Sequence, residues 1–296
     1  MKKIAIVLIL FFIYNTNISR AEALYSEIYG VESVTEIKDI AKEIFAKRDP
    51  QKAVFIFPLK DFILRATHPA MQKQSENYQS LLKKAFAKVN GTENYYINEI
   101  LLSEYPYEIS DQAIVDLVQY IQSQNSGIII TTPNVTGSLN KIDFFDIWTV
   151  KYLQNKNIDL SKGVFADKKF SFNKEMKKVK GSYPSFYQGL LSYNSDGKNN
   201  SVTEALSILF VTKLKEVPNV VVAVSDSRTF LESLARQLKI LNIHNEFFGI
   251  LYKPAIIQGA DISPEDYLSF WQNFASKLPK VTRKEVDLKS ENPYEQ

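Results

Sequence analysis

The stretch VVVAVSDSRTFLESLARQLKILNIHNEFFGILY, from Val220 to Tyr252, has the pattern of a strand, a helix and a second strand. Val220–Val224 and Phe247–Tyr252 are short, unbroken apolar runs, which are typical of strands buried on both faces of a sheet. Between them, apolar side chains recur at helical spacing: Phe230, Leu231, Leu234, Leu238 and Leu241. Asp226 or Ser227 is placed to cap this helix. Because parallel neighbours need such a crossover, the stretch predicts a βαβ unit.

Three earlier apolar runs predict further buried strands: Ala53–Phe57, Gly127–Thr131 and Gly189–Tyr193. An amphipathic pattern over Ser201–Lys215 predicts a helix that leads into the strand at Val220. Strands alternating with helices predict an α/β fold, a three-layer α/β/α Rossmann-like parallel sheet. Ligands of such sheets bind beyond the carboxyl ends of the strands, so the residues that follow each run are the candidate site.

Two segments do not fit this simple alternation. We expect residues 66–125 to form a helical cap inserted after the first strand, because Glu76–Val89 and Asp111–Gln122 both have helical periodicity. Residues 166–186 are rich in lysine and carry no regular pattern, so we expect an excursion loop exposed to solvent. Its lysines are Lys168, Lys169, Lys174, Lys177, Lys178 and Lys180.

Composition narrows the function classes. The chain has 296 residues, with 36 basic and 33 acidic side chains, and this near balance argues against a nucleic-acid partner. It has no cysteine, which excludes a thiol nucleophile, disulfides and thiolate metal sites. The two histidines, His68 and His244, argue against a histidine-based zinc site or a Ser-His-Asp triad. We expect His68 in a surface turn and a structural role for His244.

The amino terminus has the zones of a secretory signal peptide: Met1-Lys2-Lys3, an apolar Ile4–Tyr14, and Ala21-Glu22-Ala23. We expect cleavage after Ala21 or Ala23, which removes residues 1–21 or 1–23. We expect the protein to be secreted or periplasmic. The apolar run is shorter than the about 20 residues that a membrane span needs, so no stable span is expected after cleavage; an uncleaved anchor is the alternative. The expected organisation is a signal peptide at 1–23, an α/β domain at 24–280 and a polar, disordered tail at 281–296.

Three segments carry a resemblance to a known family. They are GIIITTPN with the later TVKYLQNKNIDLSKG, then YQGLLSYNSDGKNN, then the stretch from Val220 to Tyr252. In this order they resemble the haloacid dehalogenase-like (HAD) superfamily, and more narrowly the exported bacterial family called domain of unknown function 2608, over about residues 50–255. The resemblance implies a phosphatase-type site, with an aspartate nucleophile, a second acid, a Ser or Thr, a lysine and acids that hold Mg²⁺.

The first motif of that superfamily, D-x-D-x-T, is replaced in this chain. Aligning the apolar pair Ile63-Leu64 places Pro58 at the nucleophile, Lys60 at the general acid and Phe62 at the threonine. These three are degenerate catalytic positions, since proline offers neither a carboxylate nor an N–H. Asp61 is the alternative, as a displaced nucleophile or as a solvated loop carboxylate.

The other motifs survive in part. The resemblance places Thr132, or Thr131 beside it, at the second motif and Lys198 at the third, while Asp226 keeps one acid of the fourth. We expect ligand binding by Thr132, Lys198, Lys60 and Asp226. Asp226 is the one expected metal ligand, and a lone carboxylate holds Mg²⁺ weakly, so no cofactor is expected unless the protein is active. One hypothesis pairs the Lys60 ammonium with Asp226; the alternative is a Lys60 side chain in solvent.

These observations predict a catalytically degenerate, hydrolase-like domain that binds an anionic ligand or a protein partner. Two alternatives stay open. One is an active, exported, Mg²⁺-dependent phosphoric monoester hydrolase with rearranged acids. The other is a secreted host-interaction factor that recognises its partner through residues 66–125.

Overall fold

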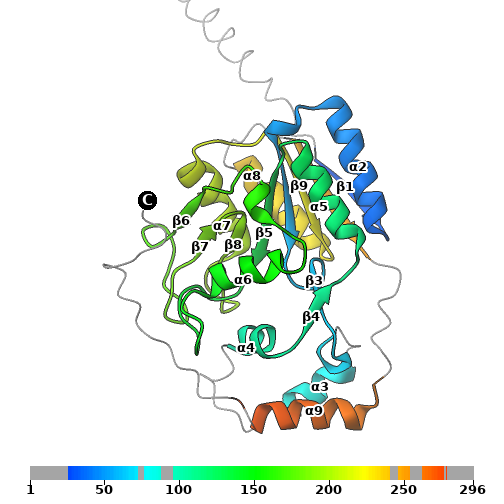
Figure 1. The fold of residues 1–296 in the computed structure, drawn as a ribbon, viewed down its shortest axis with the longest axis vertical. Coiled ribbons are helices and arrows are strands. Elements are labelled where there is room, and N and C mark those ends of the chain that lie inside the picture. The colour runs from blue at the N-terminus through cyan, green and yellow to red at the C-terminus, as the bar shows by residue number, and fades with distance from the viewer. Residues whose placement is uncertain are drawn as a thin grey trace, which may run out of the picture.

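The computed structural model describes residues 26–72, 77–87, 96–240, 246–253, 262–276 and 278. At its centre is a sheet with the strand order β1-β10-β9-β2-β5-β8-β7-β6 (Figure 1). The strands are β1 (Ser26–Val31), β2 (Ala53–Pro58), β5 (Gly127–Thr132), β6 (Lys169–Ser171), β7 (Ser185–Tyr187), β8 (Leu190–Ser192), β9 (Val220–Ser225) and β10 (Glu246–Tyr252). Neighbours pair parallel from β1 across to β8, whereas β7 and β6 are antiparallel. The predicted α/β class with a mostly parallel sheet is confirmed.

The five predicted strands correspond to β2, β5, β8, β9 and β10. Strand β1 was not predicted, and the reason is its place at the edge of the sheet, where it pairs with β10 alone. Its Glu27, Ile28 and Tyr29 are half-buried, so the strand lacks the unbroken apolar run that marks a strand covered on both faces.

Alternate side chains of the central strands enter two separate cores. Phe55 and Phe57 of β2 share a core with helices α2 (Val34–Lys47) and α5 (Ala113–Ser123). Val54 and Ile56 share the other core with α7 (Val202–Ile208) and α8 (Arg228–Ile240). This alternation follows from the two-residue period of a strand, and helices on both faces give the molecule three layers.

Residues 66–125, expected to form one cap, divide between two places. α5 packs against α2 and β5, where it is the crossover helix between β2 and β5. The range also contains β4 (Tyr107–Ile109), which pairs antiparallel with β3 (Leu64–Ala66), and α4 (Ile97–Glu104). The helix at Asp111–Gln122 therefore belongs to the layer over the sheet, because its buried face of Ile114, Leu117, Val118 and Ile121 belongs to the same core as β2 and β5.

A helical subdomain stands apart from the sheet. It consists of α3 (Asn77–Ala85), the short helix Pro69–Met71 and α9 (Pro264–Ser276), with α3 and α9 side by side at the far end from the sheet (Figure 1). Trp271 of α9 is its centre, in ring contact with Phe86, Tyr267, Phe270 and Phe274. The subdomain thus joins a segment inserted after β2 to the last helix of the described chain.

The lysine-rich residues 166–186 are not simply a loop, which corrects the prediction. They contain β6 and most of β7, which extend the sheet beyond β8 as an antiparallel meander. Each of these strands has three residues, too few to give a recognisable alternation in the sequence. The extension carries the adjacent loop, residues 177–182, to the edge of the sheet.

The predicted signal peptide and the tail at 281–296 lie outside the described residues, as does His244. Among the helices that the structure describes, none has the length and apolar character needed to cross a bilayer. His68 is described: it is half-buried, stacks on Phe270 with ring centroids 4.1 Å apart, and accepts a hydrogen bond from Ala70 N at Nδ1. Burial lowers its pKa, consistent with a packing role.

Candidate functional site

The carboxyl edge of the sheet begins at Pro58, the last residue of β2. Pro58 lies opposite Thr131 of β5, and the Leu59 amide donates to the Thr131 carbonyl at 2.9 Å. The chain then turns back at once: Leu64 N donates to Leu59 O at 2.8 Å, and Asp61 adopts a left-handed φ of 66°. Residues 58–64 therefore form a tight, hydrogen-bonded turn.

Apolar packing fills this turn. Phe62 is buried, stacks on Phe57 with centroids 5.2 Å apart, and meets Tyr252 of β10 edge-on at 5.3 Å. Leu59 and Ile63 are buried beside it. Of the three positions that the resemblance aligned with catalytic groups, Phe62 thus carries a side chain that packs in the core.

Lys60 and Asp226 both extend into solvent. Within the described part of the chain Lys60 forms no ion pair, so the hypothesised Lys60–Asp226 pair is not present. The physical reason is the turn, which exposes Lys60 between the buried Leu59 and Phe62. Ser227, one of the two predicted caps, fulfils that role for α8, because its Oγ accepts from Phe230 N at 3.2 Å.

The acidic side chains of the described residues do not form a cluster that could bind a metal ion. Among the described residues, no three His, Cys, Asp or Glu side chains lie close enough to hold a metal ion together. Burial, with a smaller contribution from the Asp61 carboxylate, raises the pKa of Tyr107 to about 12. Asp61 therefore acts electrostatically on Tyr107 of β4.

Thr132 is buried at the end of β5. Its Oγ1 accepts from Asn134 N at 3.3 Å, and its carbonyl accepts from Tyr193 N at 3.0 Å. These bonds fix the loop that leaves β5 and the start of the loop that leaves β8. Thr132 is therefore a buried structural residue that holds the two loops at the carboxyl edge of the sheet.

Two buried asparagines tie the lysine-rich segment to the loop after β8. Asn194 Nδ2 donates to Val179 O and Ser182 O, both at 2.7 Å. Asn200 Nδ2 donates to Lys177 O at 2.8 Å and to Asn194 O at 3.2 Å. Asn194 is fully buried, and among the described residues its Oδ1 has no hydrogen-bond partner. The bonds to Val179 O, Ser182 O and Lys177 O hold the two loops together as one surface.

Asp196 organises the tip of the second loop. Its Oδ1 accepts from the main-chain N of Lys198 at 2.9 Å and of Asn199 at 2.8 Å. The side-chain Nδ2 of Asn199 donates to Oδ2 at 3.0 Å. These bonds, the one from Asn199 N first, lower the pKa of Asp196 to about 2. Lys198, predicted to bind a ligand, is exposed at this tip and is not among the residues that line the adjoining cavity.

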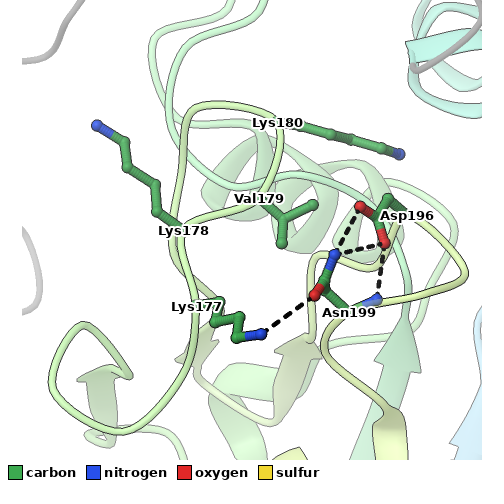
Figure 2. Close-up of a pocket in the computed structure, with 6 residues that line it drawn as sticks. All are labelled: Lys177, Lys178, Val179, Lys180, Asp196 and Asn199. Carbon is green, nitrogen blue, oxygen red and sulfur yellow. Dashed lines mark hydrogen bonds between the residues drawn. The ribbon is translucent and has the colours of Figure 1, made fainter.

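A cavity of about 270 Å³ opens between the two loops; we call it the lysine pocket. Its lining is Lys177, Lys178, Val179, Lys180, Asp196 and Asn199 (Figure 2). Figure 2 shows the Lys177 ammonium directed at Asn199, whose Oδ1 lies 3.5 Å away, and Lys178 directed away from it. The lining holds three lysines and one aspartate, and of these lysines Lys177 is the one whose ammonium points toward another lining residue.

Lys180 is the deepest of the three cations. Its side chain is 10% exposed and its Nζ lies 3.7 Å from Oε1 of Glu99, which is 1% exposed. The same Glu99 oxygen accepts from Val135 N at 2.9 Å, so α4 and the loop after β5 brace the back of the pocket. Lys177 and Lys178, in contrast, are exposed.

Residues 33–276, from the start of α2 to the end of α9, match a protein family described as "Protein of unknown function (DUF2608)". The chain belongs to this family. The matched region of this DUF2608 chain includes both the turn at Pro58 and the lysine pocket.

Relatives of this DUF2608 protein span nearly its whole length. It is 26% identical over 291 residues to an uncharacterized protein of Rickettsia bellii, with 95% of each chain covered. It is 26% identical over 299 residues to an uncharacterized protein of Rickettsia conorii, covering 98% of this chain and 96% of the relative. No solved structure matches the chain.

The lysine pocket escaped prediction as a site, although its lysines were noted in the sequence. The predicted ligand residues Thr132, Lys198, Lys60 and Asp226 do not line it. A local signal existed in KKVK, residues 177–180, whose three lysines are half of the six lining residues. The pairing of this run with Asp196 and Asn199 depends on the asparagine bonds across the loops, which no sequence spacing reveals.

The lowered pKa of Asp196 gives a direct test of this loop. Because folding lowers the pKa from 3.8, its ionisation stabilises the folded loop above pH 3.8, and that contribution is lost as the pH falls toward 2. Following the Lys198 and Asn199 amide protons by NMR during an acid titration should therefore give a midpoint near 2. A midpoint close to 3.8 would mean that these hydrogen bonds do not form in solution.

Proposed function

We propose that this DUF2608 protein is a HAD-like domain that has lost phosphoryl transfer and binds an anionic ligand in the lysine pocket. The observation that carries the proposal is a cavity at the carboxyl side of the sheet, where α/β folds bind their ligands, with Lys177, Lys178 and Lys180 among its lining residues. We further propose that the protein acts after export, as the residues before 24 suggest.

The loss of catalysis is supported by the chemistry at the end of β2. A HAD-type reaction needs a carboxylate there to form a phosphoaspartyl intermediate. This chain has Pro58 at that position, and the stacked Phe62 occupies the aligned threonine position. Neither side chain attacks phosphorus or donates to a phosphoryl oxygen, so the remaining polar groups fit binding better than turnover.

The ligand class follows from the charges. Lysine ammonium groups act as point charges that suit phosphate or carboxylate oxygens, whichever direction the oxygens approach from. The pocket has an open, solvated side formed by Lys177 and Lys178, where ionic attraction is screened by salt. We therefore propose a small anion or an anionic headgroup, bound with an affinity that falls as ionic strength rises.

The catalytic half of the proposal is tested by hydrolysis of a generic aryl phosphate, with and without Mg²⁺. We expect the purified chain to show no turnover above the Asp226→Asn and Asp61→Asn variants, because no carboxylate stands at the end of β2. Mg²⁺-dependent turnover that either variant abolishes would contradict the proposal and would establish an active phosphatase with rearranged acids.

A further inference from the structure

A second cavity lies at the opposite, amino edge of the sheet, away from the lysine pocket. It has a volume of about 220 Å³ and adjoins the starts of β2 and β5. Its apolar lining consists chiefly of Val54, Val164, Phe165, Phe210, Leu214 and Val217. Gln51, Lys52, Lys168 and Glu216 also line it, so polar and charged side chains share the walls with the apolar ones. We call it the apolar cavity.

One wall of the apolar cavity is formed by an unusual helix. α7 continues as a π-helix over Leu209–Leu214, which supplies Phe210 and Leu214, and the helix ends at Lys215 with a left-handed φ of 53°. π-Helical segments are rare and are frequently found at functional sites. The one in this chain lies against the cavity.

The rim of the apolar cavity carries exposed hydrophobic side chains. Val164 is 43% exposed and Val217 is 39% exposed, and both line the cavity. Gly127 forms part of the lining, and a Cβ there would lie 2.9 Å from both the Phe165 ring and Val54. The glycine therefore lets the Phe165 ring close against β5 as a wall.

The cations of this cavity are weakly engaged. Lys52 Nζ lies 3.6 Å from Glu216, with side chains 50% and 81% exposed, and Lys168 lies 3.3 Å from the adjacent Asp167. Exposed pairs of this kind contribute little to stability, so a ligand carboxylate is able to replace Glu216 at Lys52 at little cost.

We propose that the apolar cavity binds a small monocarboxylate whose body is an aromatic ring or a short branched chain. An apolar cavity of about 150 Å³ accommodates benzene, so 220 Å³ has room for a ring with a short acid side chain. The apolar walls take the body, and Lys52, with Lys168 nearby, takes the carboxylate. This inference is independent of the anion site proposed above, since it concerns other residues at the opposite edge of the sheet.

The probe for this proposal is phenylacetate, titrated into the full chain and followed by two-dimensional NMR at Gly127 and Val164. We expect saturable shifts with a Kd on the order of 1 mM or tighter, a range reasonable for ten non-hydrogen atoms. 2-Phenylethanol, which keeps the ring and lacks the charge, should bind at least about fivefold more weakly, because a neutral hydroxyl makes a weaker hydrogen bond to the ammonium than a carboxylate does.

Matched variants locate the site. Val164→Trp and Val217→Trp should each fill the mouth of the cavity and weaken phenylacetate binding by about tenfold or more. Val211→Trp is the control, since Val211 is 48% exposed on the same π-helix and is not among the lining residues. Lys52→Met should weaken binding about fivefold, whereas Lys141→Met, which removes an exposed lysine elsewhere, should not.

Three results would overturn the proposal: no saturable shift at Gly127, equal binding of the alcohol and the acid, or equal effects of the tryptophan variants at positions 164 and 211. Melting temperatures of the variants, measured alongside, identify any that fail to fold. Because positions 164 and 217 are tested separately, one unfolded variant leaves the other to decide.

Discussion

Replacing Trp271 by alanine is expected to lower the free energy of unfolding by about 3–5 kcal/mol, the usual cost of truncating a buried tryptophan. Trp271 is 6% exposed, and its ring lies 5.2 Å from Phe270 and 5.7 Å from Phe274, centroid to centroid. Its Nε1 donates to Ala70 O at 3.0 Å, which binds α9 to the segment inserted after β2. Urea unfolding followed by circular dichroism gives the measurement.

Trp271→Phe is the matched control for this variant. It keeps an aromatic ring in the cluster and removes the hydrogen bond to Ala70, so it should cost clearly less than alanine. A loss below about 1 kcal/mol for Trp271→Ala would show that the helical subdomain does not depend on this residue.

Replacing Gly189 by alanine is expected to cost about 3 kcal/mol for two physical reasons. Gly189 joins β7 to β8 with φ at +95°, a conformation that costs other residues about 1–2 kcal/mol. A Cβ there would also lie 2.9 Å from the carbonyl oxygen of Ile128, and overpacking typically adds about 1–3 kcal/mol. The backbone oxygen belongs to β5 and has little freedom to move.

Gly197→Ala separates these two causes. Gly197 also has a positive φ, +83°, but a Cβ there would have no atom within 4 Å. It should therefore show the conformational cost alone, about 1–2 kcal/mol. Equal losses of stability for the two variants, measured by thermal unfolding, would mean that the contact with Ile128 contributes nothing.

The sequence predicted the interior of the sheet well because burial on both faces leaves a continuous apolar run. β2, β5, β9 and β10 all have such runs, with nearly every side chain buried. The edges were harder. β1 lies at the edge of the sheet with one neighbouring strand, and β6 and β7 have three residues each, so none of them leaves a distinctive pattern. The helix at Asp111–Gln122 was recognised as a helix but assigned to the cap, because periodicity does not say which surface an apolar face covers.

The candidate site shows the same division. The strand ends at Pro58 and Thr132 were placed from the apolar runs, since a strand end is a local property. The lysine pocket depends on side-chain amides of Asn194 and Asn200 that bind the main chain of a segment 12–23 residues earlier. Hydrogen bonds of this kind produce no periodic pattern in the sequence. The pocket is therefore recognised only from the three-dimensional arrangement of the two loops.

Titrating the chain with inorganic phosphate or pyrophosphate, followed by the NMR shifts of the residue 178 and Asn199 amides, tests the central claim most directly. We predict saturable binding that weakens as salt rises, and a loss of about tenfold or more in the Lys177→Ala/Lys178→Ala variant. The matched control is Lys141→Ala/Lys174→Ala, which removes the same charge at exposed positions outside the pocket and should bind nearly as the unmodified chain does. No saturable shift at these amides, or equal weakening by both double variants, would contradict an anion site in the lysine pocket.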